Sequence, residues 1–294
     1  MPTLFCFGLG YSARHLAAKL EDEGWHIAGT ARSDDGVERI RDLGYTGFVF
    51  DGLSPSKGAG PSQGAGPAVR RASHVVISAP PDADGDPVLR HHGDDIAQSS
   101  AEWIGYLSTI GVYGDHGGGW VDETTPATPS SERSRRRALA EQQWLDFAKA
   151  SGKRVEIFRL AGIYGPGSSA IDGLKSGTTR SVVKKDQVFN RIHVEDIAQT
   201  LIAAFSRPHL HAIYNVTDDE PAPPQDVNAF AAKLLNLPLP KEIAYEEAQL
   251  SEMGRSFYSE NKRVHNDRIK SDLGVKLAFP TYREGLAAIA KGGV

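Results

Sequence analysis

The chain has 294 residues, enough for one large domain or two modest ones around a buried core. Apolar residues make up 40%, charged residues 24% and aromatic residues 8%, a usage that excludes wholesale disorder, collagen and coiled coils. With 33 basic and 37 acidic residues the formal net charge is -4, which gives no general field for phosphate polymers, so we expect no nucleic-acid partner.

The first half of the chain alternates between strand and helix patterns. Thr3 to Phe7 is short, apolar and rich in strand formers, which predicts a buried strand. After the turn Gly8 to Ala13, apolar residues at helical spacing predict a helix that ends near Gly24. The alternation then continues in this order: strand Trp25 to Thr30, helix around Val37 to Leu43, strand Gly47 to Phe50, strand His74 to Ser78, helix Pro87 to Gln98, strand Trp103 to Ser108, helix Arg133 to Ala150 and strand Val155 to Ala161. Such repetition predicts an α/β fold with a doubly wound parallel sheet and right-handed crossovers.

Two stretches depart from this alternation. Ser54 to Pro67 is rich in Gly, Pro, Ser and Ala, so we expect a mobile surface insertion there. Beyond Gly165 the pattern loosens into a strand at Arg191 to Val194, a helix at Asp196 to Phe205, a strand at Ile213 to Val216 and largely helical sequence after that. We therefore expect a sheet domain over residues 1–165, with its last sheet elements near 196–216, and a small, mainly helical lobe over 166–294 interleaved with it.

The turn after the first strand carries the first chemical signal. Gly8, Gly10 and Ala13 form a G-x-G-x-x-A pattern between a strand and a helix. Glycines at these places let the backbone approach a pyrophosphate at the positive end of the helix, and alanine is tolerated at the third position. The context favours dinucleotide binding over a purely structural turn.

The end of the second predicted strand indicates which dinucleotide. A free ribose 2′-hydroxyl usually meets an acidic residue about 20 residues after the glycines, but this chain has Arg32 there. A guanidinium can pair with a 2′-phosphate through charge-assisted hydrogen bonds, which favours NADP(H) over NAD(H). The alternative is a solvated loop arginine neutralised by Asp34 and Asp35.

Three further segments, Tyr106 to Gly114, Phe158 to Gly167 and Arg191 to Ile197, carry recognisable motifs. Together with the glycine turn they resemble the extended short-chain dehydrogenase/reductase superfamily, specifically the NAD-dependent epimerase/dehydratase family and its atypical members. The resemblance covers nearly the whole chain in the family's order. It implies a Rossmann domain with a small C-terminal substrate lobe and a cofactor lying across the carboxyl ends of the strands.

The resemblance also implies roles for individual residues. Thr109 falls where the family keeps its catalytic Ser/Thr, with Ser108 beside it, and His193 opens the family's His-Val-x-Asp signature near the boundary of the lobe. The residues implied to bind the cofactor are Gly8, Gly10, Tyr11, Ser12, Ala13, Arg32, Asp51, Ser78, Ala79, Pro80, Ala161 and Ile163.

The chain departs from the family at the Tyr-x-x-x-Lys pair, which supplies a proton donor and a lysine that lowers its pKa. Arg137 stands at the lysine position and Arg133 at the tyrosine position, and no tyrosine lies from Ser130 to Trp144. An arginine at 137 can hold a ribose or a phosphate, but it cannot deliver a proton at neutral pH. The usual mechanism of hydride transfer is therefore in doubt.

Other candidate groups are weaker. Tyr258 and Lys262 belong to the polar segment Ser256 to Arg263, which either faces the substrate pocket or is a solvated loop. The adjacent His91 and His92 would point to different faces of a helix, so we expect no metal site.

These observations leave two functions open. The first is an NADP(H)-preferring enzyme acting on a small polar or sugar- or nucleotide-linked carbonyl or alcohol; the alternative is a non-catalytic NADP(H)-binding sensor or scaffold protein. A chain that binds no dinucleotide ranks third. The resemblance implies dimerisation through the helices after the fourth and fifth strands, yet charge is crowded over Arg133 to Arg137, so monomer and homodimer both stay open. The single cysteine and the lack of a long apolar run predict a cytoplasmic protein with no membrane partner.

Overall fold

The computed structural model describes residues 1–57 and 64–293. These residues form two compact units, each made of several chain segments. The first comprises residues 1–109, 135–159 and 201–214, and the second comprises residues 110–134, 160–200 and 215–294. Residues 110–134 thus group with the second unit, and the chain enters that unit again at Leu160. The expected domains, residues 1–165 and 166–294, stay a prediction.

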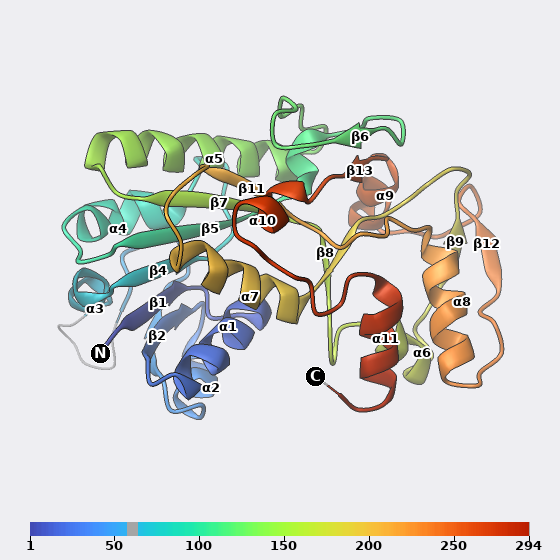
Figure 1. The fold of residues 1–294 in the computed structure, drawn as a ribbon, viewed down its shortest axis with the longest axis horizontal. Coiled ribbons are helices and arrows are strands. Elements are labelled where there is room, and N and C mark those ends of the chain that lie inside the picture. The colour runs from blue at the N-terminus through green and yellow to red at the C-terminus, as the bar shows by residue number, and fades with distance from the viewer. Residues whose placement is uncertain (58–63, 294) are drawn as a thin grey trace. The chain divides into compact units, whose positions relative to one another are not determined.

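The first unit is built on a seven-stranded sheet of order β11-β7-β5-β4-β1-β2-β3, and the neighbouring pairs from β3 through β5 are parallel. Its elements are β1 (Thr3–Phe7), α1 (Tyr11–Asp22), β2 (His26–Ala31), α2 (Asp34–Arg41), β3 (Thr46–Val49), α3 (Gly66–Arg71), β4 (His74–Ile77), α4 (Pro87–Ala97), β5 (Trp103–Thr109), α5 (Glu132–Ser151), β7 (Val155–Leu160) and β11 (Ile213–Val216). α1 and α2 cover one face of the sheet and α4 and α5 the other (Figure 1). The expected doubly wound α/β fold is confirmed.

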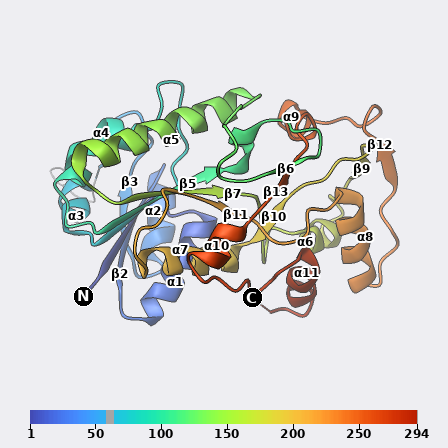
Figure 2. The same cartoon turned by 45° about the horizontal axis from the view of Figure 1, so that its top comes forward.

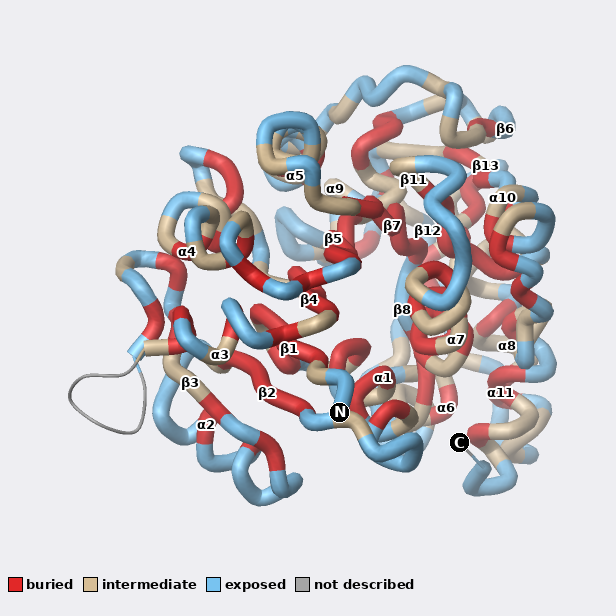
Figure 3. The backbone as a smooth tube through the Cα atoms, turned by 60° about the vertical axis from the view of Figure 1, so that its left-hand side comes forward, coloured by how far each residue is buried: buried red, intermediate tan, exposed pale blue. Residues whose placement is uncertain are grey.

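Burial explains why the strands read as continuous apolar runs. Leu4, Phe5, Cys6 and Phe7 of β1 are all fully buried, because helices cover both faces of a parallel sheet. The central strands stand out as buried in Figure 3. On α1, the residues that set the predicted helical spacing form the buried stripe that packs on the sheet.

The expected surface insertion at Ser54 to Pro67 is wrong for its last residues, which are packed in the sheet domain. Helix α3 begins at Gly66, and Val69 is fully buried in the core of the sheet domain. Ala65 is also fully buried, and its amide donates to the Ser56 hydroxyl at 2.8 Å. Proline in the first turn starts the helix, and small apolar side chains suffice to pack it. Residues 58–63 of the expected insertion lie outside the described residues.

The second unit contains short elements that the sequence pattern only partly predicts. They are η1 (Ile110–Tyr113), β6 (Trp120–Val121), β8 (Gly162–Tyr164), α6 (Ala170–Lys175), β9 (Ser181–Val183), β10 (Arg191–His193), α7 (Val194–Phe205), α8 (Pro224–Leu234), β12 (Glu242–Ala244), α9 (Glu252–Tyr258), β13 (Arg263–Val264), α10 (Asp267–Ser271) and α11 (Tyr282–Ala290). Four elements cross the division: residues 132–134 of α5, 160 of β7 and 215–216 of β11 belong to the second unit, and residues 201–205 of α7 belong to the first. The expected helical C-terminal region is present, and α6, α8 and α11 pack around one apolar cluster (Figure 2). Three two-stranded pairs, β8 with β10, β9 with β12 and β6 with β13, accompany these helices.

Within the described residues, none of the helices combines the length and the apolar character that crossing a bilayer requires.

Candidate functional site

The turn between β1 and α1 has the geometry that the glycine pattern predicts. Gly8 adopts a φ of 88°, a region that disfavours residues with a Cβ. A Cβ there would lie 3.1 Å from the Ala79 nitrogen, so the end of β4 passes directly against this glycine. Gly10 precedes α1 as its N-cap with no side-chain cap, and a Cβ on it would meet nothing within 4 Å. The space beside Gly10 at the start of α1 is therefore open to a ligand, as an anion site at a helix N-terminus requires.

A pocket of about 480 Å³ opens beside this turn in the first unit. It is lined by Gly8 to Gly10, the end of β2 from Thr30 to Ser33, the start of α2, and Ser78 to Pro80 after β4. Its volume falls within the usual range for a small-molecule site. The structure thus brings together the predicted residues Gly8, Gly10, Arg32, Ser78, Ala79 and Pro80.

Three arginines border this pocket. Arg32 follows β2, Arg14 lies in the first turns of α1, and Arg39 lies on α2. All three are exposed, and none of their guanidinium groups forms a hydrogen bond or ion pair with another described residue. Asp34 and Asp35 therefore form no ion pair with Arg32 among the described residues. Sequence reasoning missed Arg14 and Arg39; their signal would have been a basic residue one turn into each of the helices that follow β1 and β2.

The remaining predicted residues of the turn support it from inside. Ser12 and Ala13 are buried on α1, and Tyr11 packs its ring on His15 at 4.8 Å. Asp51 lies just past β3, is exposed, and accepts the Leu53 amide at 2.9 Å, but it does not line the pocket.

The two glycines permit a matched pair of variants. Gly8→Ala should lower the free energy of unfolding by about 1–2 kcal/mol, because its Cβ would meet the backbone of Ala79 in a strained conformation. Gly10→Ala should leave stability nearly unchanged, since its Cβ points into open space, yet it should weaken dinucleotide binding by narrowing the approach to the helix N-terminus. Urea denaturation and nucleotide titration of both variants measure this. Equal stability losses in the two would contradict the assignment.

At the carboxyl ends of β5 and β7 lies a buried polar cluster of Ser108, Glu141 and Arg159. The Glu141 carboxylate accepts from the Arg159 Nη2 at 2.7 Å and from its Nε at 3.2 Å, and both side chains are about 5–6% exposed. The Ser108 hydroxyl donates to the same carboxylate. The hydroxyl proton of Ser108 is therefore engaged in the bond to Glu141. Thr109, the last residue of β5, is half-buried.

Arg137, which the resemblance places at the family's lysine position, reaches the same end of β5. Its Nη1 donates to the Leu107 carbonyl at 2.9 Å and to the Tyr106 hydroxyl at 3.1 Å. Arg133, which the resemblance places at the family's tyrosine position, belongs to the second unit, where its guanidinium lies 5.1 Å from the centre of the Phe257 ring.

The residues of the His193 motif pack and form hydrogen bonds inside the second unit. The ring of His193 is fully buried against Phe279, at 4.0 Å between centres, and its Nδ1 accepts the Glu195 amide. The Asp196 carboxylate accepts the amides of Ala278 and Phe279 at 2.7 and 3.1 Å. These bonds hold the segment that leads into α11.

The other predicted residues of the second unit also make internal contacts. The Tyr258 hydroxyl donates to the Val182 carbonyl at 3.2 Å, and the Lys262 Nζ donates to the Gly114 carbonyl at 2.6 Å and to Glu260 at 2.7 Å. Ala161 is buried and Ile163 of β8 is partly exposed. Whether these side chains serve a ligand stays a prediction.

A buried carboxyl group in the second unit makes stability depend on pH. Burial raises the pKa of Asp218 to about 8, although the Glu220 amide and the Arg191 charge oppose this. Because the folded-state pKa exceeds the unfolded value of about 3.9, ionisation destabilises the folded state as the pH rises between those two values. Asp218→Asn should therefore stabilise the protein increasingly from about pH 5 to pH 8. Thermal denaturation across this range measures it, with the exposed Asp267→Asn as control; parallel pH profiles of Asp218→Asn and wild type would contradict it.

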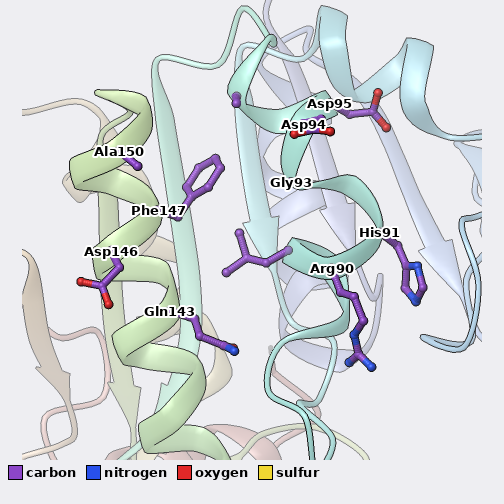
Figure 4. A pocket seen from close by; sticks show the side chains of 11 residues that line it. Arg90, His91, Gly93, Asp94, Asp95, Gln143, Asp146, Phe147 and Ala150 are labelled. Carbon is purple, nitrogen blue, oxygen red and sulfur yellow. The ribbon is translucent and has the colours of Figure 1, made fainter.

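A second hollow, of about 710 Å³, lies between α4 and α5 (Figure 4). Phe147 and Gln143 of α5 point toward α4, while His91 points away from α5. It contains none of the predicted site residues, and charges of both signs border it. The resemblance implies a second copy at these helices, which stays an expectation. No group of three or more metal-ligating side chains occurs in the part of the chain that the structure describes.

Comparison with known proteins adds independent observations. The model of the NAD dependent epimerase/dehydratase family matches residues 96–217. A solved structure of a functionally unknown conserved protein from Silicibacter pomeroyi DSS is 49% identical, covers 99% of both chains and superposes with a TM-score of 0.85. Protein YeeZ of Escherichia coli K12 is 28% identical over 280 residues, 93% of this chain and 94% of that protein. UDP-glucose 4-epimerase of Thermus thermophilus, solved as its NAD complex, shares the fold with a TM-score of 0.75 at 20% identity over the whole of both chains.

Proposed function

Because this chain belongs to the NAD-dependent epimerase/dehydratase family of extended short-chain dehydrogenases/reductases, we propose that it is an NADP(H)-dependent enzyme. Its substrate is a small polar carbonyl or alcohol, free or linked to a sugar or nucleotide. The observation that carries the proposal is the pocket that joins the glycine turn to Arg32.

The residues present fit the phosphates of this cofactor. Gly10 leaves the helix N-terminus open for a pyrophosphate, and Gly8 lets the end of β4 close the turn. Arg32, with Arg14 and Arg39 at the same pocket, offers positive charge with no ion-pair partner among the described residues, where an acidic residue would otherwise select a free 2′-hydroxyl. We assign Arg32 to a 2′-phosphate, because a planar guanidinium binds phosphate through two parallel hydrogen bonds.

When bound, the nicotinamide ring supplies or accepts a hydride. Thr109, at the end of β5, is assigned to orient the reacting oxygen through its hydroxyl. Ser108 is assigned to position Thr109, because the hydrogen bond from the Ser108 hydroxyl to Glu141 anchors the end of β5. We place this chemistry in the cytoplasm, which the buried free thiol of Cys6 supports.

Turnover tests the enzymatic part directly. Purified protein saturated with NADPH is incubated with a panel of polar aldehydes, ketones and nucleotide-linked keto sugars, and loss of the reduced cofactor is followed by absorbance. At least one substrate should be reduced, and Thr109→Val should slow its reduction by about a hundredfold or more with NADPH affinity intact. Binding of NADPH without turnover of any substrate would overturn the proposal of an enzyme and would favour a protein that only binds the nucleotide.

A further inference from the structure

Arg137 is held at the carboxyl end of β5 by neutral groups only. Its Nη1 donates to the Leu107 carbonyl and to the Tyr106 hydroxyl, and its guanidinium carbon lies 5.7 Å from the centre of the Tyr106 ring. Its Nε and Nη2 donate to no other described residue. The side chain is half-buried, so Nη1 is fixed by two hydrogen bonds while the Nε and Nη2 donors are not used by any described residue.

No carboxylate forms a salt bridge with Arg137 among the described residues, although the nearby charge of Asp86 attracts it. Glu141, one helical turn further along α5, would be its ordinary partner, but Arg159 and Ser108 occupy that carboxylate. Asp86 is buried at the start of α4 and accepts the amides of Val88 and Leu89, and it makes no ion pair with Arg137 among the described residues. A guanidinium that is fixed through one nitrogen, with two unused donors and no salt bridge to a carboxylate, is suited to an anionic ligand.

The cofactor's phosphates are assigned to other places in the same unit. The pyrophosphate belongs at the turn after β1, and a 2′-phosphate belongs at Arg32 after β2. In the sheet order, β5 is two strands away from β1, on the side opposite β2, so it lies about 10 Å from the glycine turn. The charge of Arg137 is therefore available to another ligand at the carboxyl edge of the sheet, where α/β proteins bind their substrates.

We propose that Arg137 binds a carboxylate or phosphate group of the substrate. The inference rests on the proposed function, and it names the substrate class: an acid, or a phosphate ester, with its carbonyl or alcohol near the anionic group. The arginine thus replaces the family's lysine with a specificity-determining residue, because its planar fork matches two anionic oxygens as a lysine does not.

The test uses malonate and inorganic phosphate as probes, with neutral malonamide as the uncharged comparison. The NADPH-saturated full chain is titrated with each by calorimetry at constant ionic strength, and the titrations are repeated without nucleotide. Malonate or phosphate should bind the wild type and malonamide should not. Arg137→Gln should weaken binding of the anion by about tenfold or more, and Arg137→Lys should recover part of the affinity. Arg135 is an exposed arginine on the same helix, so Arg135→Gln should bind the anion as the wild type does.

Three results would overturn the inference. One is that neither anion binds the wild type; a second is that Arg137→Gln binds the anion with unchanged affinity. The third is that Arg137→Gln loses NADPH affinity while it keeps the anion, which would assign the arginine to the cofactor. Anion binding that depends on Arg137, in a wild-type protein that binds no NADPH, would instead overturn the proposed function and leave the anion site standing.

Discussion

Replacement of Glu141 by alanine should lower the free energy of unfolding by about 3–5 kcal/mol. The carboxylate is buried on α5 and carries hydrogen bonds from Arg159 of β7 and Ser108 of β5. Its removal deprives a buried guanidinium of its carboxylate and leaves a space in the packing of α5 on the sheet. The loss should far exceed that of an ordinary surface substitution.

Urea denaturation of Glu141→Ala beside Gln142→Ala measures this effect. Gln142 is the next residue on α5 and is exposed, so its replacement should change stability by no more than about 0.5 kcal/mol. Glu141→Gln keeps the volume and one acceptor oxygen and should fall between the two. A loss below about 1 kcal/mol in Glu141→Ala would show that the ion pair contributes no more than a surface pair.

Replacement of Arg32 by alanine should lower the affinity for NADPH by about tenfold to a hundredfold and leave the affinity for NADH nearly unchanged. The guanidinium is exposed beside the pocket with no carboxylate partner, so its loss removes a charge-assisted contact without disturbing the fold. Arg14→Ala and Arg39→Ala should produce smaller losses of the same kind, because both border the same pocket.

Fluorescence titration of the variant with both reduced nucleotides measures the ratio of affinities. Arg41→Ala is the matched control, since Arg41 is exposed in the last turn of α2 and does not line the pocket. A parallel loss of NADPH and NADH in Arg32→Ala would assign the arginine to the pyrophosphate or to the fold rather than to a 2′-phosphate.

The sheet domain could be predicted from local patterns because its strands are buried on both faces. Thr3 to Phe7 and His74 to Ile77 read as continuous apolar runs for that reason, and the glycine turn between β1 and α1 needs a backbone that only glycine adopts easily. The position of Arg32 followed from the same regularity, since a residue at the end of β2 lies beside the turn after β1.

The features that escaped prediction depend on contacts distant in sequence. Helix α3 is held by small residues such as Ala65 and Val69, whose burial no local period signals. The pairing of Glu141 with Arg159 joins residues 18 positions apart, and it leaves Arg137 without its partner one turn along α5. Each strand in the two-stranded pairs of the second unit has only two or three residues, which is too short to show the apolar and polar alternation that predicts a strand.

The pocket beside Gly8 and Arg32 is expected to select NADP(H) over NAD(H). Calorimetric titration of the wild-type chain with NADPH and NADH, in the same buffer, tests this selectivity directly. The phosphorylated nucleotide should bind tighter by about tenfold or more, with one molecule bound per chain. Equal affinities, tighter binding of NADH, or no binding of either would contradict it.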